Sequence, residues 1–199
     1  MNQRTLRLVA IFAAFFAGLA LCLGVIVFAT GHSTVAGAPQ AAAIGGPFQL
    51  TDQDGRTVTD KDFRGKPFLV FFGFTHCPEV CPTTLFDISE IMRDLGKDAD
   101  RTAAVFITVD PQRDTQEAMK EYMSSFDPHV RSLTGDEATL AAVAKAYRVY
   151  YKKVPLEDGD YTMDHTAIVY LMDKEGRFVS PFNMRRTAEA AAADLRKRL

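Results

Sequence analysis

The chain has 199 residues, of which 47% are hydrophobic and 24% charged, with 3 cysteines and no tryptophan. This balance is typical of one or two globular domains and excludes a disordered, collagen-like or disulfide-packed miniprotein. The formal net charge is −2, and residues 31–199 carry −4 because the first 30 residues hold two arginines and no acid. A slightly acidic body argues against nucleic acid as the main partner.

An uncharged run of 22 residues, from Leu8 to Ala29, stands near the start of the chain. As a helix it would be about 33 Å long, which is enough to cross the hydrocarbon of a bilayer. Arg4 and Arg7 precede the run, so the excess of positive charge places residues 1–7 in the cytoplasm. We therefore expect residues 8–29 to form a transmembrane anchor, with the rest of the chain on the outer side.

Two other interpretations of this segment are less favoured. A cleaved signal peptide would have a shorter apolar core of about 7–15 residues, and Pro39 directly follows the small residues 36–38, where it would obstruct cleavage. A lipoprotein anchor at Cys22 would require a small residue in the place of Leu21. We interpret Cys22 as an ordinary apolar residue of the span.

Residues 30–46 are rich in Ala, Gly, Ser and Pro, lack charged residues and show no periodicity. Such a composition is typical of a flexible tether. Residues 47–199 contain no second linker and no internal repeat, and they are numerous enough to bury a core. We predict one folded domain there.

The domain alternates short apolar runs with helical periodicity. Strands are expected at residues 48–50, 56–58, 68–74, 103–109, 166–172 and 177–181. Helices are expected at residues 82–96, 115–126, 136–147 and 187–199. Helical crossovers make successive strands parallel, whereas a tight turn makes its two strands antiparallel. The order predicts an α/β sandwich with a mixed central sheet, most similar to the thioredoxin-like fold.

Cys77 and Cys81 are the only cysteines of this domain, and they lie between an apolar strand and a helix. The carboxyl end of a buried strand is where α/β proteins place ligands. A helix N-terminus also stabilises the thiolate, which attacks disulfides and binds metals. A structural disulfide is the alternative, because one helical turn places the two Cα atoms about 6 Å apart. Its small loop would stabilise the fold little, so a functional pair is favoured.

Four histidines are available to complete a metal site. His165 precedes a predicted strand whose start would face the dithiol helix, although capping that strand is its alternative role. His76 adjoins Cys77, but successive side chains diverge, and His32 and His129 are expected in the tether and in a surface turn. Two thiolates and one imidazole suit Cu(I) better than hard cations. Structural zinc usually takes four protein ligands, which these residues do not supply. Catalytic zinc could be held by Cys, Cys and His with a water as the fourth ligand, and the spacing does not exclude it.

Three blocks together resemble the Sco/SenC family: His76-Cys77-Pro78-Glu79-Val80-Cys81-Pro82, Val109-Asp110-Pro111-Gln112-Arg113-Asp114-Thr115, and Asp164-His165-Thr166. The resemblance covers nearly all of residues 46–199, and the N-terminal span fits it. It implies a membrane-tethered, thioredoxin-like copper protein that helps to assemble the dinuclear copper A centre of cytochrome c oxidase.

The resemblance places the metal ligands at Cys77, Cys81 and His165. These residues would bind Cu(I), and binding of Cu(II) as well is an open alternative. It also places Asp110 beside the site, where it would assist copper transfer or docking. The alternative for Asp110 is a strand-end turn, followed by a helix cap at Asp114 or Thr115.

The implied partners are the copper A subunit of the oxidase, a periplasmic copper donor or thiol reductant, and the membrane. In a bacterium the domain would lie in the periplasm on the inner membrane, and in a eukaryote it would face the mitochondrial intermembrane space. Copper delivery needs ligand exchange and no catalytic turnover. Residues 148–163 are expected to form a mobile loop that lets His165 close on copper.

Two enzymatic functions are the alternatives. A thiol–disulfide reductase would keep the copper-site cysteines of the oxidase reduced, with one of the two cysteines attacking and the other resolving. Thioredoxin oxidoreductases carry C-x2-C and a cis-proline before the facing strand, whereas this chain has C-x3-C and His165-Thr166, which favours metal binding. A peroxiredoxin-like peroxidase is least favoured, because no Pro-x3-Thr-x2-Cys pattern surrounds either cysteine.

Overall fold

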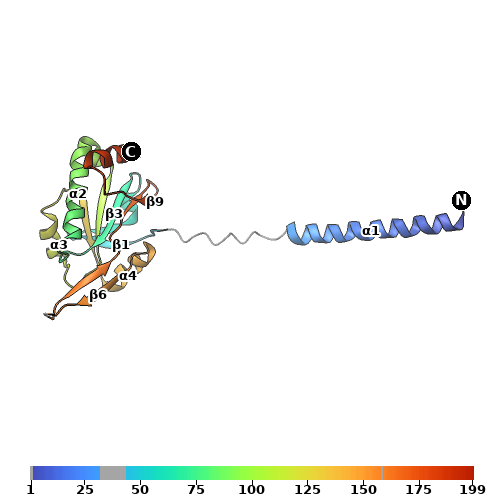
Figure 1. Ribbon diagram of the computed structural model, residues 1–199, viewed down its shortest axis with the longest axis horizontal. Coiled ribbons are helices and arrows are strands. Elements are labelled where there is room, and N and C mark those ends of the chain that lie inside the picture. Colours follow the sequence, from blue (N-terminus) through green and yellow to red (C-terminus); the bar gives the residue numbers. More distant parts are fainter. Residues whose placement is uncertain (1, 32–43, 158) are drawn as a thin grey trace. The chain divides into compact units, whose positions relative to one another are not determined.

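The computed structural model describes residues 2–31, 44–157 and 159–199 (Figure 1). The chain divides into two compact units, residues 1–42 and 43–199. In the first, helix α1 (Gln3–Gly31) contains the whole uncharged run. None of the helices in the described part of the chain combines the length and apolar character that a membrane span requires. Most of the predicted tether, including the small residues before Pro39, lies outside the described residues.

The second unit is built around one seven-stranded sheet. Its elements are β1 (Gln49–Asp52), β2 (Thr57–Thr59), η1 (Asp60–Phe63), β3 (Phe68–Gly73), α2 (Val80–Leu95), η2 (Gly96–Arg101), β4 (Ala103–Thr108), α3 (Gln116–Met123), β5 (Val130–Thr134), α4 (Glu137–Ala146), β6 (Tyr151–Pro155), β7 (Tyr161–His165), β8 (Val169–Met172), β9 (Phe178–Pro181) and α5 (Ala188–Arg196). The strand order is β2-β1-β5-β4-β3-β8-β9. β3, β4 and β5 run parallel, and the other neighbours run antiparallel. This mixed sheet with flanking helices confirms the predicted thioredoxin-like class.

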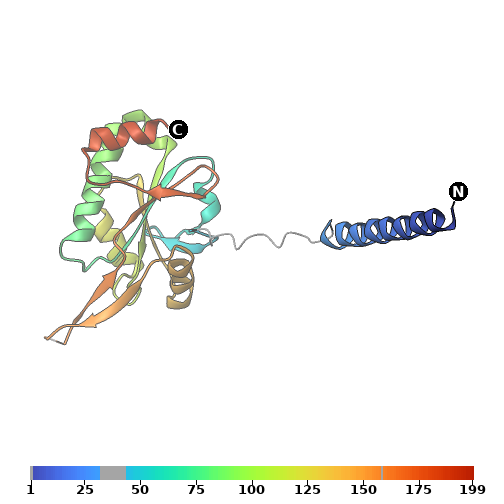
Figure 2. The ribbon, with the colours of Figure 1, turned by 45° about the vertical axis from the view of Figure 1, so that its right-hand side comes forward.

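Both faces of the central strands are covered by helices. Every residue of β3 and β4 is buried, as the continuous apolar runs predict. Phe71 stacks on Phe106, which in turn contacts Tyr122 of α3. Phe72 points to the opposite face, where it contacts Tyr147 at the end of α4. α2 and α3 therefore cover one face and α4 the other (Figure 2), while α5 packs against α2.

One central strand is absent from the sequence prediction. β5 lies between β1 and β4 in the sheet, although its sequence, Val-Arg-Ser-Leu-Thr, gives no apolar run. Ser132 is buried there, and both its backbone N–H and its hydroxyl donate to Gln53 Oε1, at 2.9 Å and 3.3 Å. A hydrogen bond to a side chain 79 residues away satisfies this buried polar residue, and local patterns do not reveal such a partner.

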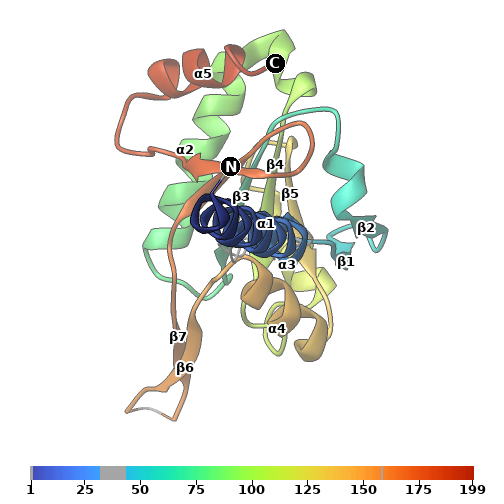
Figure 3. The same cartoon turned by 90° about the vertical axis from the view of Figure 1, so that its right-hand side faces the viewer.

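The segment before His165 is a hairpin, and the expectation of a loop at residues 148–163 is wrong. β6 and β7 pair antiparallel from Tyr151 opposite His165 to Pro155 opposite Tyr161, as a separate two-stranded sheet (Figure 3). Side chains alternate across a strand, so Tyr161, Met163 and His165 share one face, on which Met163 is buried. That alternation is the sequence signal for the strand.

Candidate metal centre

The two cysteines are positioned by the junction between β3 and α2. The helix begins at Val80, two residues before the predicted start, so Cys81 lies in its first turn and is fully buried. Cys77 stands in the preceding loop, where its N–H donates to the carbonyl of Phe74 at 3.2 Å. The N–H of Cys81 donates to Cys77 Sγ at 3.3 Å, and such N–H groups at a helix start favour a bound anion. Both thiols are free.

Gly73 allows the sulfur of Cys81 to lie against the end of β3. A Cβ at this position would stand 2.7 Å from Cys81 Sγ and 2.8 Å from Phe106 Cε2. Real contacts of this kind are about 3.5–4.0 Å, so a side chain here would displace both of these neighbours or shift the backbone of Gly73. The glycine is therefore a requirement of the site rather than of the strand.

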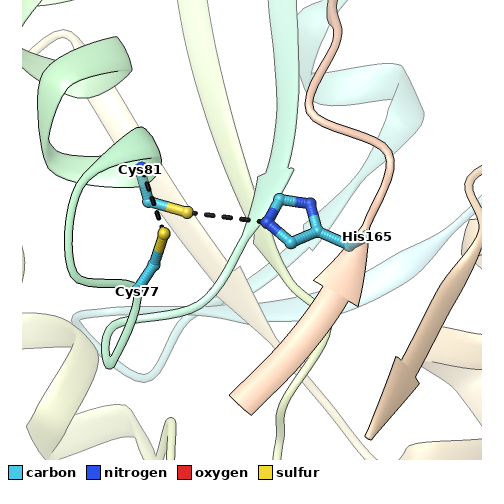
Figure 4. A group of neighbouring side chains, drawn as sticks. All are labelled: Cys77, Cys81 and His165. Atoms are coloured by element: carbon cyan, nitrogen blue, oxygen red, sulfur yellow. Dashed lines mark hydrogen bonds between the residues drawn. The ribbon is translucent and has the colours of Figure 1, made fainter. Parts of the chain in front are cut away.

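His165 faces the cysteines from the last residue of β7 (Figure 4). Its Nε2 lies 3.8 Å from Cys81 Sγ, and its Nδ1 lies 3.3 Å from the carbonyl oxygen of Thr166. When Nδ1–H donates to that carbonyl, the lone pair of Nε2 is left for the sulfur or for a metal. The ring also meets Phe74 edge-on, with centroids 5.7 Å apart, which limits its rotation.

Burial sets the protonation states of this pair. It raises the pKa of the Cys81 thiol well above its ordinary value and lowers the pKa of His165 below 6.5. A neutral thiol therefore donates its S–H to a neutral imidazole at physiological pH. A cation that enters between the two atoms takes the place of that proton.

The donor set fits a single soft cation. The ligand atoms of Cys77, Cys81 and His165 all lie within 4.8 Å of one another. Three ligands at about 2.0–2.3 Å from one ion in a plane are about 3.5–4.0 Å apart, so small shifts would close the group on an ion. Two sulfurs and one imidazole nitrogen suit Cu(I). Within the described ranges, no fourth His, Cys, Asp or Glu joins the group, which disfavours a closed structural zinc site.

Asp110 is not one of the three clustered donors. It is buried, its Oδ2 accepts from Arg113 Nε at 2.6 Å, and its Oδ1 accepts from the hydroxyl of Tyr161 at 2.8 Å. The turn that was its alternative role is present, because the N–H of Asp114 donates to the carbonyl of Asp110 at 2.9 Å. Thr115 caps α3 by accepting from the N–H of Ala118.

Asp114 has a role that sequence reasoning missed. Instead of capping a helix, its buried carboxylate accepts from the N–H of Thr75 at 3.1 Å and from the Thr75 hydroxyl at 2.6 Å. It also accepts from the hydroxyl of Thr108 at 2.6 Å. Asp114 thus ties the cysteine loop to the end of β4. A partner 39 residues away gives no local signal.

The two other histidines in the described residues, His76 and His129, are not part of the group of candidate donors. His76 is half exposed and lies 3.0 Å from the hydroxyl of Thr75. His129 lies between Asp127 and Asp100 in a partly exposed turn, as predicted. His32 lies outside the described residues.

Comparison with known sequences finds relatives from one family. The sequence model of the SCO1/SenC family matches residues 36–199. Human "Protein SCO1 homolog, mitochondrial" is 43% identical over 154 residues, 75% of this chain and 51% of that protein. Arabidopsis thaliana "Protein SCO1 homolog 1, mitochondrial" is 46% identical over 142 residues, 69% of this chain and 42% of that protein. The chain therefore spans about half the length of the curated relatives it matches.

Solved structures share the fold. Bradyrhizobium japonicum ScoI with copper bound is 67% identical, has a TM-score of 0.77, and the match covers 79% of this chain and 100% of that one. Yeast Sco1 with copper bound is 34% identical and has a TM-score of 0.71, and the match covers 78% of this chain and 87% of that one. BsSco, described as a member of the Sco family of cytochrome c oxidase assembly proteins, shares the fold at 22% identity and a TM-score of 0.63, with 80% and 95% covered. With a match over most of its length, this chain belongs to the SCO1/SenC family.

Proposed function

We propose that this protein is a membrane-anchored copper chaperone that binds copper through Cys77, Cys81 and His165. The observation that carries the proposal is the convergence of two sulfurs and one imidazole nitrogen within 4.8 Å. The copper-bound relatives support it, as does the preference of Cu(I) for soft ligands. The recipient is the copper A subunit of cytochrome c oxidase. A periplasmic partner either donates copper to this protein or keeps its two thiols reduced.

Copper is the cargo of this reaction, and transfer requires only ligand exchange. Cys77 is the more accessible sulfur, whereas Cys81 is buried. An incoming thiolate of the recipient therefore meets the ion on the Cys77 side and displaces that ligand first. His165 and Cys81 hold the ion until the recipient has supplied its own ligands.

A transfer assay tests this function. The full chain, in detergent and loaded with one Cu(I), is mixed with the apo copper A domain of an oxidase, with a strong Cu(I) chelator present to trap free ions. We expect copper to reach the copper A domain, and a Cys77→Ser/Cys81→Ser variant to deliver none. Copper that stays on the loaded chain, or that moves equally well with the double variant, would contradict the proposal.

The proposal includes an N-terminal anchor over residues 8–29. Its support is the sequence alone: an uncharged run of 22 residues with Arg4 and Arg7 before it. The domain would then face the periplasm in a bacterium, or the intermembrane space in a mitochondrion. The human and Arabidopsis thaliana relatives described above are both named mitochondrial. Extraction of the full chain by alkaline carbonate without detergent would contradict this anchor.

A second function, thiol–disulfide reduction, is favoured by the two free sulfurs in adjoining positions. In it, Cys77 attacks a disulfide of the recipient and Cys81 then displaces the recipient. The pair loses two electrons and two protons as a Cys77–Cys81 disulfide forms, and the recipient gains two thiols. This function predicts that His165→Ala still reduces the disulfide of the recipient, whereas copper binding predicts that the variant loses affinity for Cu(I).

A further inference from the structure

The hairpin that carries His165 forms its own sheet among the residues that the structure describes, so side-chain contacts, among them that of the buried Met163, must fix its position. β6 and β7 pair only with each other in the described part of the chain. His165 is at the base of this hairpin, and Tyr161 is four residues further out, about 13 Å along the strand. A rotation of the hairpin about its base would tilt β7 and so change the direction in which the His165 side chain extends toward the two sulfurs.

Arg113 contacts the hairpin at that outer position. Its Nη1 donates to the carbonyl oxygen of Tyr161 at 2.8 Å and to Asp160 Oδ1 at 3.2 Å. Its guanidinium also lies over the ring of Tyr161, 3.7 Å from the ring centroid. One planar, forked cation therefore holds backbone, carboxylate and aromatic ring together, which a lysine ammonium does not reproduce.

Arg113 is itself held by the body of the domain. Asp110, fully buried after the end of β4, accepts from its Nε at 2.6 Å, and the other oxygen of the same carboxylate accepts from the Tyr161 hydroxyl. The side chain of Arg113 is only 16% exposed. On its other side the guanidinium lies 5.9 Å from the centroid of Phe74, whose ring meets His165 edge-on.

We propose that Arg113, anchored by Asp110, is a positioning residue that clamps Tyr161 and so fixes His165 in reach of the copper held by Cys77 and Cys81. This inference rests on the proposed copper function. It gives Asp110 a task in the site although the residue donates no ligand atom. Residues that orient a metal ligand in this way typically contribute a factor of about 10–100 to metal affinity.

The test is a double-mutant cycle on Cu(I) affinity, measured by competition with bicinchoninate on the full chain in detergent. We expect Arg113→Met to weaken Cu(I) binding by about 10–100-fold. Arg113→Lys, which keeps the positive charge, should weaken it less than Arg113→Met does. Tyr161→Phe, which removes one hydroxyl and keeps the ring, weakens binding less and in the same direction. Arg101→Met is the matched control, because Arg101 is an exposed arginine paired with Asp98 beyond the other end of β4, and it leaves affinity within about twofold.

The His165→Ala background decides whether Arg113 acts through the imidazole. We expect Arg113→Met to add less than about twofold there, because its effect needs the ligand that it positions. An equal loss in both backgrounds, or unchanged affinity in Arg113→Met and Tyr161→Phe, overturns the inference while copper binding stands. Unchanged affinity in His165→Ala alone contradicts the proposed ligand set, and the inference falls with it. Melting curves of each variant identify any that fail to fold, and the milder Tyr161→Phe then decides.

Discussion

Replacing Gly73 by alanine should damage the metal site more than the fold. The new Cβ would lie 2.7 Å from Cys81 Sγ and 2.8 Å from Phe106 Cε2, against about 3.5–4.0 Å for an ordinary contact. Both neighbours, or the backbone of Gly73 itself, must therefore move, by about 1 Å in total for each contact. Overpacking of this kind costs about 1–3 kcal/mol of unfolding free energy, and displacing a ligand sulfur should weaken Cu(I) binding by about 10–100-fold.

A second glycine provides the matched control. Gly96, which directly follows the end of α2, has φ of 56°, and an added Cβ there would meet no neighbouring side chain within 4 Å. Gly96 has ψ of −124°, outside the left-handed helical region, so Gly96→Ala should cost about 1–3 kcal/mol through backbone strain, with no change in Cu(I) affinity. Urea unfolding and Cu(I) competition on both variants separate the two effects. Equal copper affinity in Gly73→Ala and the wild type would refute this account of how Cys81 is placed.

Three further predictions concern buried and charged groups. Asp114→Asn should lower the unfolding free energy by about 1–3 kcal/mol, because an amide keeps only one acceptor oxygen for the hydroxyls of Thr75 and Thr108 and leaves one of the two donors unpaired; unchanged urea unfolding would contradict this. Since burial raises the pKa of Cys81, Cu(I) binding at pH 7 should release at least one proton and strengthen as pH rises; calorimetry in buffers of different ionisation enthalpy would detect this proton, and no release would count against a neutral thiol. Burial lowers the pKa of His129, but its two aspartate partners outweigh burial and raise it. Its stabilisation is therefore full below about pH 6.5 and lost as pH rises through the higher folded pKa. His129→Asn should then cost more stability at pH 5.5 than at pH 8.5, and an equal cost would refute the assignment.

The parts of the fold that follow from the sequence are those whose cause is local. Continuous apolar runs identify β3 and β4, and the three- and four-residue spacing of Leu85, Ile88, Met92 and Leu95 identifies α2, where all four are buried. β5 carries polar residues in a central strand, and its burial depends on a partner far along the chain. The hairpin of β6 and β7 has two short strands with charged residues on their outer faces. The charged and glycine-containing sequence around them is typical of a loop, so the alternation of buried and exposed side chains in β7 is difficult to recognise.

The candidate site divides in the same way. Cys77, Cys81 and His165 are reactive residue types at the ends of predicted elements, and the structure brings their ligand atoms together. The groups that shape the site are different, because Gly73, Asp114 and Arg113 act through neighbours in space. A glycine, an acid and an arginine in such places have many ordinary roles, and only the folded chain shows what each one contacts.

The central claim is that two sulfurs and one imidazole of this chain hold one copper ion. Copper stoichiometry and Cu(I) affinity of the reduced full chain in detergent test it directly, with His165→Ala and Cys77→Ser/Cys81→Ser alongside. The account predicts one tightly bound copper per chain, weaker binding in His165→Ala and none in the double serine variant. No specific copper in any version, together with a readily reducible Cys77–Cys81 disulfide, would contradict it and favour the thiol reductase.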